Sequence, residues 1–295
     1  MSTPALEVHD LVYRYGSKEA LHGLNLTVQP GECHGLFGRN GAGKTTAIKC
    51  LLHLLRPDSG SIRVMGLDPA RAEARVKSSL AYVPDFVAFY PWMSVREALD
   101  YQASFRQHWN GDLEASLLRQ FRLDPTAPTS SLSKGQRTQL ALVGAIAAEP
   151  ELLVLDEPTS GLDPRVRREF IETVIGAYQD SAPGKRTVLV STHLIHEFEG
   201  LIDRFTIVDQ GRSILTSDAD AARARFRRVR AEYSSEPPAD LICPNARQVR
   251  RDARALEWVV EQGEEELLEL LQPSRPHQVT VDSLSLEEIF LNTVK

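Results

Sequence analysis

The sequence predicts an α/β fold built around a parallel sheet. Residues 151–155 and 187–190 are short, continuously apolar stretches, as expected of strands buried on both faces. A third apolar stretch, residues 33–37, runs into a glycine-rich loop, and helical spacing follows from Lys44 to about Leu55. Strands and helices that alternate in this way are typical of open α/β sheets.

Two regions depart from this alternation. Residues 91 to about 122 have helical spacing and little strand character, so we expect a helical insertion there. Near the N-terminus, residues 6–13 and 24–28 alternate apolar and polar side chains and predict two further strands.

After about Ser217 the composition changes, and we expect a small α+β accessory region over residues 218–295. Its expected elements are an Arg-rich helix at 221–230, a strand at 256–260, a helix at 264–271 and a strand at 278–281. Ser285 with Glu288 three residues later is a capping-box pattern, which predicts the start of a terminal helix.

The composition excludes few functions, but it limits the partners and the cellular compartment that we expect. The 295 residues carry a formal net charge of −6, which gives no support to a general nucleic-acid binder, so no nucleic-acid partner is expected. Three scattered cysteines form no CxxC pair and fit a reducing cytosol. The longest uncharged apolar stretch, residues 140–148, is far shorter than the roughly 20 residues of a membrane span. If the protein acts at a membrane, we therefore expect it to do so through a partner protein.

Residues 38–45, GRNGAGKT, match the phosphate-binding pattern G-x-x-x-x-G-K-[ST]. The glycines let backbone N–H groups turn toward phosphate oxygens, and the following helix adds the positive end of its dipole. Lys44 would reach the β- and γ-phosphates, and the Thr45 hydroxyl would ligate Mg²⁺. The predicted ATP-binding residues of this segment are Gly38, Arg39, Asn40, Gly41, Ala42, Gly43, Lys44, Thr45 and Thr46.

Two carboxylates follow the apolar strand at 151–155 directly. Buried acids cost free energy unless they are paired or bind a metal ion. We expect Asp156 to hold Mg²⁺ through water, and Glu157 to orient or deprotonate the attacking water. A solvated loop acid at either position is the structural alternative.

His193 follows the apolar strand at 187–190 and lies at the sheet edge where ligands of open α/β sheets gather. We expect it to contact the γ-phosphate, so that the catalytic set is Glu157, His193 and Lys44. A purely structural histidine is the alternative.

The pentapeptide LSKGQ, residues 132–136, lies upstream of Asp156 with a helix between them. It resembles L-S-G-G-Q, the signature motif of the ABC ATPases. Residues 160–163, ending in Asp163, resemble the D-loop of that family, and Tyr15 resembles its adenine-stacking aromatic residue. All these motifs occur in the family's order, so the resemblance covers roughly residues 5–217.

The resemblance implies a P-loop NTPase fold of the ABC ATPase type in residues 1–217, with a RecA-like core, an antiparallel β subdomain and a helical insertion at about 85–148. It also implies hydrolysis of ATP with Mg²⁺ as cofactor, coupled to transport. In this family the signature loop completes the ATP site of a second subunit. Ser133, Gly135 and Gln136 would therefore act in trans.

The same resemblance implies two kinds of partner. One is a second ABC ATPase subunit, identical or not, and the other is a set of integral membrane permease subunits. The chain would then be cytoplasmic and peripheral on the inner face of the cell membrane. Residues 283–291 resemble the closing helix of ATPases that serve ABC-2 transporters, which are mostly exporters. This resemblance favours export as the direction of transport. An ordinary amphipathic helix that packs on the core is the alternative interpretation of these residues.

Two residues depart from the family pattern. Lys134 stands in place of one of the two glycines of the signature motif, which is compatible with function because Ser133 and Gly135 remain. Asp85 stands where members usually carry Gln or sometimes Glu. Asp is shorter than Glu and carries a charge that Gln lacks, so Asp85 is either a metal contact, direct or through water, or a structural loop acid.

Two other functions stay open on the sequence. One is a soluble ABC ATPase that acts on ribosomes or DNA, although this chain has one ATPase domain, an acidic balance and no coiled coil or zinc module. The other is a regulatory pseudo-ATPase, which the intact Lys44, Asp156, Glu157 and His193 disfavour. The arginines between 223 and 230 predict a solvated face, and contact with lipid headgroups or a partner is the alternative. Trp92 and Trp109 fit either a core or a partner groove.

Overall fold

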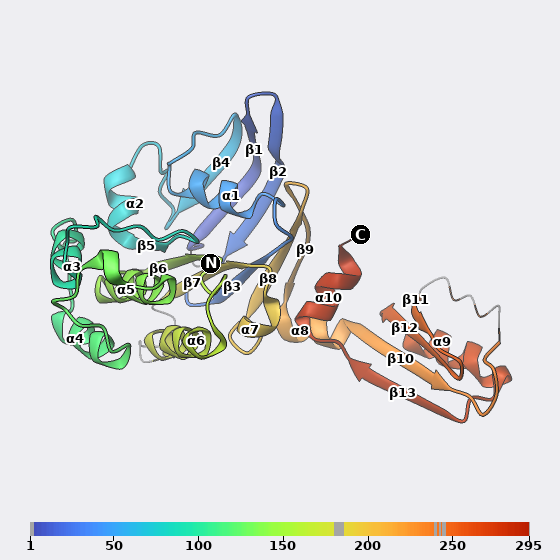
Figure 1. Ribbon diagram of the computed structural model, residues 1–295. Helices are drawn as coiled ribbons and strands as arrows, with labels where there is room; N and C mark the ends of the chain where they lie inside the picture. The colour runs from blue at the N-terminus through green and yellow to red at the C-terminus, as the bar shows by residue number, and fades with distance from the viewer. Residues whose placement is uncertain (1–2, 180–185, 239–240, 242, 244–245, 295) are drawn as a thin grey trace. The chain divides into compact units, whose positions relative to one another are not determined.

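The computed structural model describes residues 3–179, 186–238, 241, 243 and 246–294. The chain divides into two compact units, Met1–Thr216 and Ser217–Lys295. The division falls one residue before the boundary expected from composition. Each unit has its own sheet and helices (Figure 1).

The central sheet of the first unit has six strands in the order β5-β6-β7-β3-β8-β9. These are β3 (Cys33–Phe37), β5 (Leu80–Val83), β6 (Leu152–Asp156), β7 (Thr187–Thr192), β8 (Arg204–Asp209) and β9 (Arg212–Asp218). The pairings from β5 to β8 are parallel, and every residue of β3, β6 and β7 is buried. The prediction of buried parallel strands is therefore confirmed.

A second, antiparallel sheet lies in the same unit, in the order β2-β1-β4. Its strands are β1 (Leu6–Tyr15), β2 (Lys18–Val28) and β4 (Ser59–Val64). Leu6 and Val8 of β1 share one hydrophobic core with Leu36 of β3 and Ile48 of the first helix. This core fixes the antiparallel sheet against the central one.

Seven α-helices and one short 3₁₀ turn accompany the sheets in the described part of the first unit. They are α1 (Lys44–Leu51), α2 (Glu73–Ser79), α3 (Val95–Ala103), α4 (Gly111–Gln120), η1 (Thr129–Ser131), α5 (Lys134–Ala147), α6 (Pro164–Gln179) and α7 (Ile195–Phe198). The insertion consists of α3, α4 and α5, and Figure 1 shows these three helices together at one end of the unit. Ser94 and Glu97 form a capping box at the start of α3.

Helix α1 ends at Leu51 and not at the expected Leu55. His53 has a left-handed backbone with φ 55°, and its N–H donates to the carbonyl of Cys50. The N–H of Leu54 donates to the carbonyl of Lys49. This is a Schellman ending with a histidine in the position that glycine usually takes, so the sequence lacks the usual stop signal.

The C-terminal unit holds a four-stranded antiparallel sheet in the order β11-β12-β10-β13. Its elements are α8 (Ala219–Arg225), β10 (Phe226–Glu232), β11 (Ala246–Arg251), β12 (Ala255–Glu261), α9 (Glu264–Leu271), η2 (Gln272–Ser274), β13 (Gln278–Ser283) and α10 (Leu286–Thr293). Val229, Leu256, Trp258 and Leu267 form its core. The predicted capping box of Ser285 starts α10.

The prediction of one Arg-rich helix from 221 to 230 is wrong. The helix ends at Arg225, and Phe226–Glu232 is a strand that pairs with β12 on one side and β13 on the other. Strand pairing on two sides outweighs the helical preference of the local sequence. The arginines of this segment have acidic partners, such as Glu257 at 3.4 Å from Arg228 and Glu232 at 2.9 Å from Arg230.

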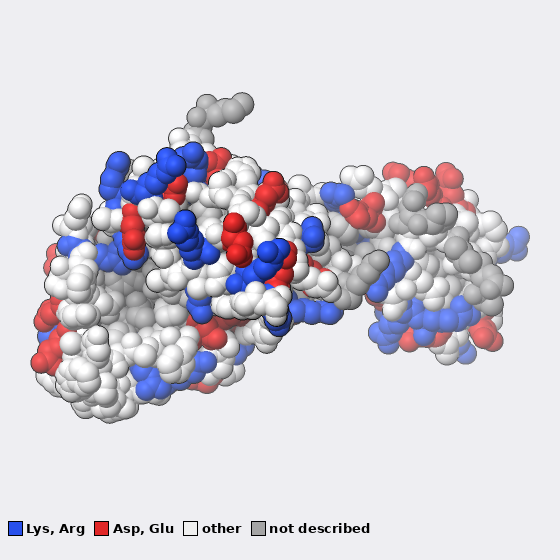
Figure 2. Space-filling view, turned by 90° about the horizontal axis from the view of Figure 1, so that it is seen from above, with Lys and Arg blue, Asp and Glu red and all other residues white. Residues whose placement is uncertain are grey.

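Within the described ranges, no helix combines the length and apolarity that a membrane span requires. On the face of the first unit that Figure 2 shows, positive and negative side chains are interspersed.

Candidate nucleotide-binding site

Residues 38–43 form a tight loop between β3 and α1, and two of its glycines have no room for a side chain. A Cβ on Gly38 would lie 2.6 Å from the carbonyl oxygen of Val208. Gly43 has φ 107°, and a Cβ there would lie 2.9 Å from the carbonyl oxygen of Ala20. Glycine is therefore required at both positions for the loop to keep its backbone conformation.

Lys44 is the first residue of α1 and is only 5% exposed. Its Nζ donates to the carbonyl oxygens of Gly38 at 2.7 Å and Arg39 at 3.3 Å. The same Nζ lies 2.9 Å from Oε1 of Glu157. The ammonium group is thus held at the loop, beside the carboxylate that follows β6.

A cavity of about 570 Å³ adjoins this loop, within the size range of small-molecule sites. It is lined by Tyr15, Lys18, Glu19, Ala20, His22, Asn40, Gly41, Ala42, Gly43, Lys44, Thr45, Thr46, Asp85, Glu157 and Gln210. Tyr15 is 48% exposed. The structure therefore brings Tyr15, the loop, Asp85 and Glu157 to one cavity, while Gly38 and Arg39 contribute carbonyl groups that hold Lys44.

Asp156 ends β6 and is almost fully buried. Burial raises its pKa, while the nearby hydroxyls of Thr45 and Ser191 and the Lys44 ammonium act in the opposite direction. Among the described residues, neither Oδ1 of Asp156 nor Oγ of Ser191 has a hydrogen-bond partner. A buried carboxylate oxygen left unsatisfied beside a threonine hydroxyl suits a hydrated divalent cation, so these residues fit Mg²⁺.

Glu157 lies between Lys44 and His193. Its Oε2 is 2.7 Å from His193 Nδ1 and accepts the backbone N–H of His193 at 3.3 Å. Its own N–H donates to the carbonyl of Ser191, and its φ is 47°, a left-handed value that is unusual for glutamate. Lys44 and His193 thus hold this carboxylate in place at the edge of the cavity.

Comparisons with known proteins agree with this geometry. The family model described as "ABC transporter" matches residues 21–160. The Nod factor export ATP-binding protein I of Burkholderia orbicola (strain AU 1054) is 37% identical over 72% of this chain and 71% of its own length. The chain belongs to the family of ABC transporter ATP-binding proteins. It is accordingly an ATPase that takes ATP as substrate.

Further relatives support the same assignment for this ABC ATPase. A daunorubicin resistance ATP-binding protein of Streptomyces coeruleorubidus is 38% identical, over 76% of this chain and 71% of its own length. A solved structure titled "Structure of ATP binding subunit of ABC transporter" is 31% identical with a TM-score of 0.67, over 75% of this chain and 92% of that chain.

The signature loop of this ABC ATPase is not part of the cavity, because no residue from 132 to 136 is among the residues that line it. Ser133 instead caps α5: its Oγ accepts the N–H of Gln136, and Oε1 of Gln136 accepts the N–H of Ser133. A Cβ on Gly135 would lie 3.1 Å from Val166. The helix end is therefore fixed in the chain, with Ser133 exposed.

Lys134, which departs from the family pattern, connects the signature loop to the D-loop. Its Nζ donates to the carbonyl of Ser160 at 2.6 Å, and a Cβ on the neighbouring Gly161 would lie 3.0 Å from that Nζ. Asp163 caps α6 by accepting the N–H groups of Arg165 and Val166. Neither Lys134 nor Asp163 lines the cavity within the described chain.

Sequence reasoning missed several residues of this site, among them Ser191 and Gln210. Ser191 is buried beside Asp156, and its position at the end of an apolar strand was a usable signal. Gln210 reaches the cavity from the turn between β8 and β9, and nothing in the local sequence marks it.

Proposed function

We propose that this ABC ATPase energises export through separate membrane subunits, as one half of an ATP-held dimer that works with Mg²⁺ at the cytoplasmic face of the cell membrane. The carrying observation is that the phosphate-binding loop and Glu157 line one cavity while the signature loop lies outside it. Relatives named for Nod factor export and daunorubicin resistance support the export direction.

Hydrolysis would use the groups around Glu157. Lys44, freed from its loop carbonyls, would bind the β- and γ-phosphates, while Glu157 orients the attacking water and accepts its proton. His193 holds the Glu157 carboxylate through Nδ1, and its contact with the γ-phosphate remains a prediction. Thr45 and Asp156 would hold the Mg²⁺ ion, which neutralises charge on the phosphates.

The second subunit would supply the hydrogen-bond donors that complete the ATP site of the first. Ser133 is exposed at the N-terminus of α5, where the helix dipole and free N–H groups favour an anion. Placed against the γ-phosphate of a partner chain, Ser133 and Gly135 would close that site, and Asp163 and Gln136 would lie beside them. With two such sites, bound ATP would hold the two subunits together, and hydrolysis would weaken their association.

Asp85 is exposed and lines the cavity with Thr45 and Glu157. We expect Asp85→Gln, which restores the common family residue, to keep ATP affinity within a few-fold. Asp85→Ala should lower hydrolysis or its coupling to transport more than binding, because a carboxylate near the metal site is lost. The Mg²⁺ dependence of phosphate release by both variants tests this. Wild-type Mg²⁺ dependence, turnover and coupling in Asp85→Ala would assign Asp85 to a structural role.

The surface that would receive the membrane subunits lies on the insertion. Four aromatic residues form a row there: Tyr90 stacks on Trp92 at 4.9 Å and meets Tyr101 edge-on at 5.9 Å, and Tyr101 meets Phe105 edge-on at 5.1 Å. Trp92 is 73% and Phe105 70% exposed. A contiguous exposed aromatic surface is typical of a protein interface. We refer to these four residues as the aromatic row.

Replacement of both Trp92 and Phe105 by Asp tests this docking surface. We expect at least about a tenfold loss in the amount of tagged chain that purifies with a polytopic membrane protein, because exposed aromatic anchors dominate interface energies. Leu54→Asp, at an exposed apolar residue outside the insertion, is the matched control. Recovery of wild-type chain with ribosomes or DNA, and with no membrane protein, would favour the non-transport alternative.

A further inference from the structure

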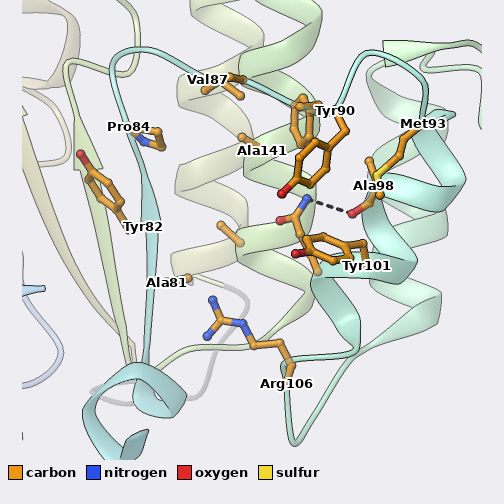
Figure 3. A pocket seen from close by; sticks show the side chains of 14 residues that line it. Ala81, Tyr82, Pro84, Val87, Tyr90, Met93, Ala98, Tyr101, Arg106 and Ala141 are labelled. Atoms are coloured by element: carbon orange, nitrogen blue, oxygen red, sulfur yellow. Dashed lines mark hydrogen bonds between the residues drawn. The ribbon is translucent and has the colours of Figure 1, made fainter. Parts of the chain in front are cut away.

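The signature loop and the D-loop belong to different parts of the first unit. The signature loop begins α5 of the insertion, whereas the D-loop follows β6 of the central sheet. From Thr138 onward most of α5 is buried, and its Ala141 faces a cavity of the insertion (Figure 3). Ser133 and Lys134, at the start of the helix, are exposed. The position of these two residues therefore depends on what holds the exposed end of α5.

A hydrogen bond joins the two loops directly. Nζ of Lys134 donates to the carbonyl oxygen of Ser160 at 2.6 Å. The same side chain lies against Gly161, which has a left-handed φ of 69° and whose Cβ, if present, would lie 3.0 Å from Nζ. A side chain at position 161 would therefore strain the backbone and meet the ammonium group. We call the hydrogen bond from Lys134 to Ser160 the Lys134 tether.

The D-loop is also anchored on the side of the central sheet. Oγ1 of Thr159, the residue before the loop, donates to Oε2 of Glu197 at 2.6 Å. Glu197 is almost fully buried and forms an ion pair with Arg167, which donates to the carbonyl oxygen of Leu162 at 3.1 Å. Glu197 belongs to α7, which begins two residues after His193. The D-loop is therefore bonded on one side to the helix that follows His193 and on the other side to the signature loop.

The exposure of the Lys134 tether determines how it can act. An exposed hydrogen bond changes an equilibrium by only about 2- to 10-fold, so this one contributes little to the stability of the whole chain. It restricts two loops that would meet a second chain, however, and loops already held in one arrangement lose less conformational entropy on binding. Lys134 does not line the nucleotide cavity. Its effect should therefore fall on association of two chains and not on nucleotide binding by one.

We infer that Lys134 is a positioning residue for the shared ATP site: it holds the D-loop and the signature loop together, so that a second chain meets both as one preformed surface. A glycine at this position, as in L-S-G-G-Q, has no side chain that could bind Ser160. The inference rests on the proposed ATP-held dimer and adds a residue that stabilises it without lining the nucleotide cavity of its own chain.

Hydrogen exchange of the isolated chain without nucleotide tests the Lys134 tether itself. The N–H groups of Ser160 and Leu162 donate to carbonyl oxygens three residues earlier, so their exchange reports opening of the D-loop. We expect Lys134→Met, which keeps the chain length and removes the donor, to speed this exchange about threefold. Lys134→Arg, which keeps a donor, should exchange like the wild type. Unaltered exchange in Lys134→Met would overturn the inference.

The dimer dissociation constant at saturating ATP tests the effect on a second chain. Sedimentation measures it in the Glu157→Gln background, where hydrolysis is blocked. A dimer contains two tethers, so a threefold effect on each predicts about a tenfold rise for Lys134→Met. Lys134→Arg should stay within about twofold of the background. Lys77→Met, at an exposed lysine of α2, is the matched control and should leave the constant unchanged.

Two further measurements accompany these variants. ATP binding at protein concentrations below dimerisation should be unchanged in Lys134→Met, and the thermal unfolding midpoint shows that each variant is folded. Faster exchange with an unchanged dimer dissociation constant would mean that Lys134 orders only its own chain, which would overturn the inference. A weaker dimer with wild-type exchange would make Lys134 a direct contact of the second chain and would overturn it as well. Absence of a dimer when Lys134 is intact would instead contradict the proposed function, and the inference with it.

Discussion

The Glu157→Gln variant is expected to bind ATP normally and to lose about 10²- to 10⁴-fold of its turnover, the usual contribution of a general base. Glutamine keeps the shape of the side chain, but its amide cannot accept a proton from water. Glu157 is held by Lys44 at 2.9 Å and by His193 at 2.7 Å, so the loss should come from chemistry and not from a displaced side chain. Single-turnover phosphate release and ATP titration measure the two effects separately.

The matched control is Glu151→Gln, at the exposed residue just before the opposite end of β6. It should hydrolyse ATP at the wild-type rate. Near-normal hydrolysis by Glu157→Gln would remove Glu157 from the mechanism and would leave its contacts with Lys44 and His193 as structural ones.

Ser133→Arg is expected to abolish turnover while a single chain still binds nucleotide. The substitution would put bulk at the N-terminus of α5, against the γ-phosphate of the partner chain. It also removes the α5 cap, which costs about 0.5–2 kcal/mol of stability. Ser133→Asp separates the two effects, because aspartate is a good cap but repels a phosphate.

We therefore expect Ser133→Asp to unfold at a temperature near that of the wild type and still to lose turnover. Ser116→Arg, at an exposed position on α4, should be active. If Ser133→Asp hydrolyses ATP at the wild-type rate, Ser133 serves only as the cap of α5 and does not act on a second chain.

The nucleotide cradle could be predicted from the sequence because its determinants are local. Gly38 and Gly43 lie within one loop, Lys44 begins the helix that follows it, and the spacing of the motif already sets their geometry. Asp156 and Glu157 follow because a buried parallel strand delivers them to the same sheet edge. For Asp85 the sequence left two roles open, a metal contact and a structural loop acid, and in the structure this residue lines the cavity.

Features set by distant contacts, or by local turns without a sequence signal, could not be predicted. Phe226–Glu232 is a strand because β12 and β13 pair with it, although its arginines also suit a helix. The end of α1 at Leu51 depends on a left-handed histidine, His53, that carries no glycine signal. Trp109 and Trp92 looked alike in sequence, yet Trp109 donates to Glu114 whereas Trp92 is exposed in the aromatic row.

Sedimentation of the Glu157→Gln protein at increasing ATP concentration tests the shared-site dimer most directly. We expect a monomer without nucleotide and a dimer whose population rises with ATP, because a ligand that binds only the dimer shifts the equilibrium by mass action. Adding the Ser133→Asp substitution to the same protein should prevent that dimer. A persistent monomer of Glu157→Gln at saturating ATP, together with unaltered turnover in Ser133→Asp, would contradict the proposal that two chains share each ATP site.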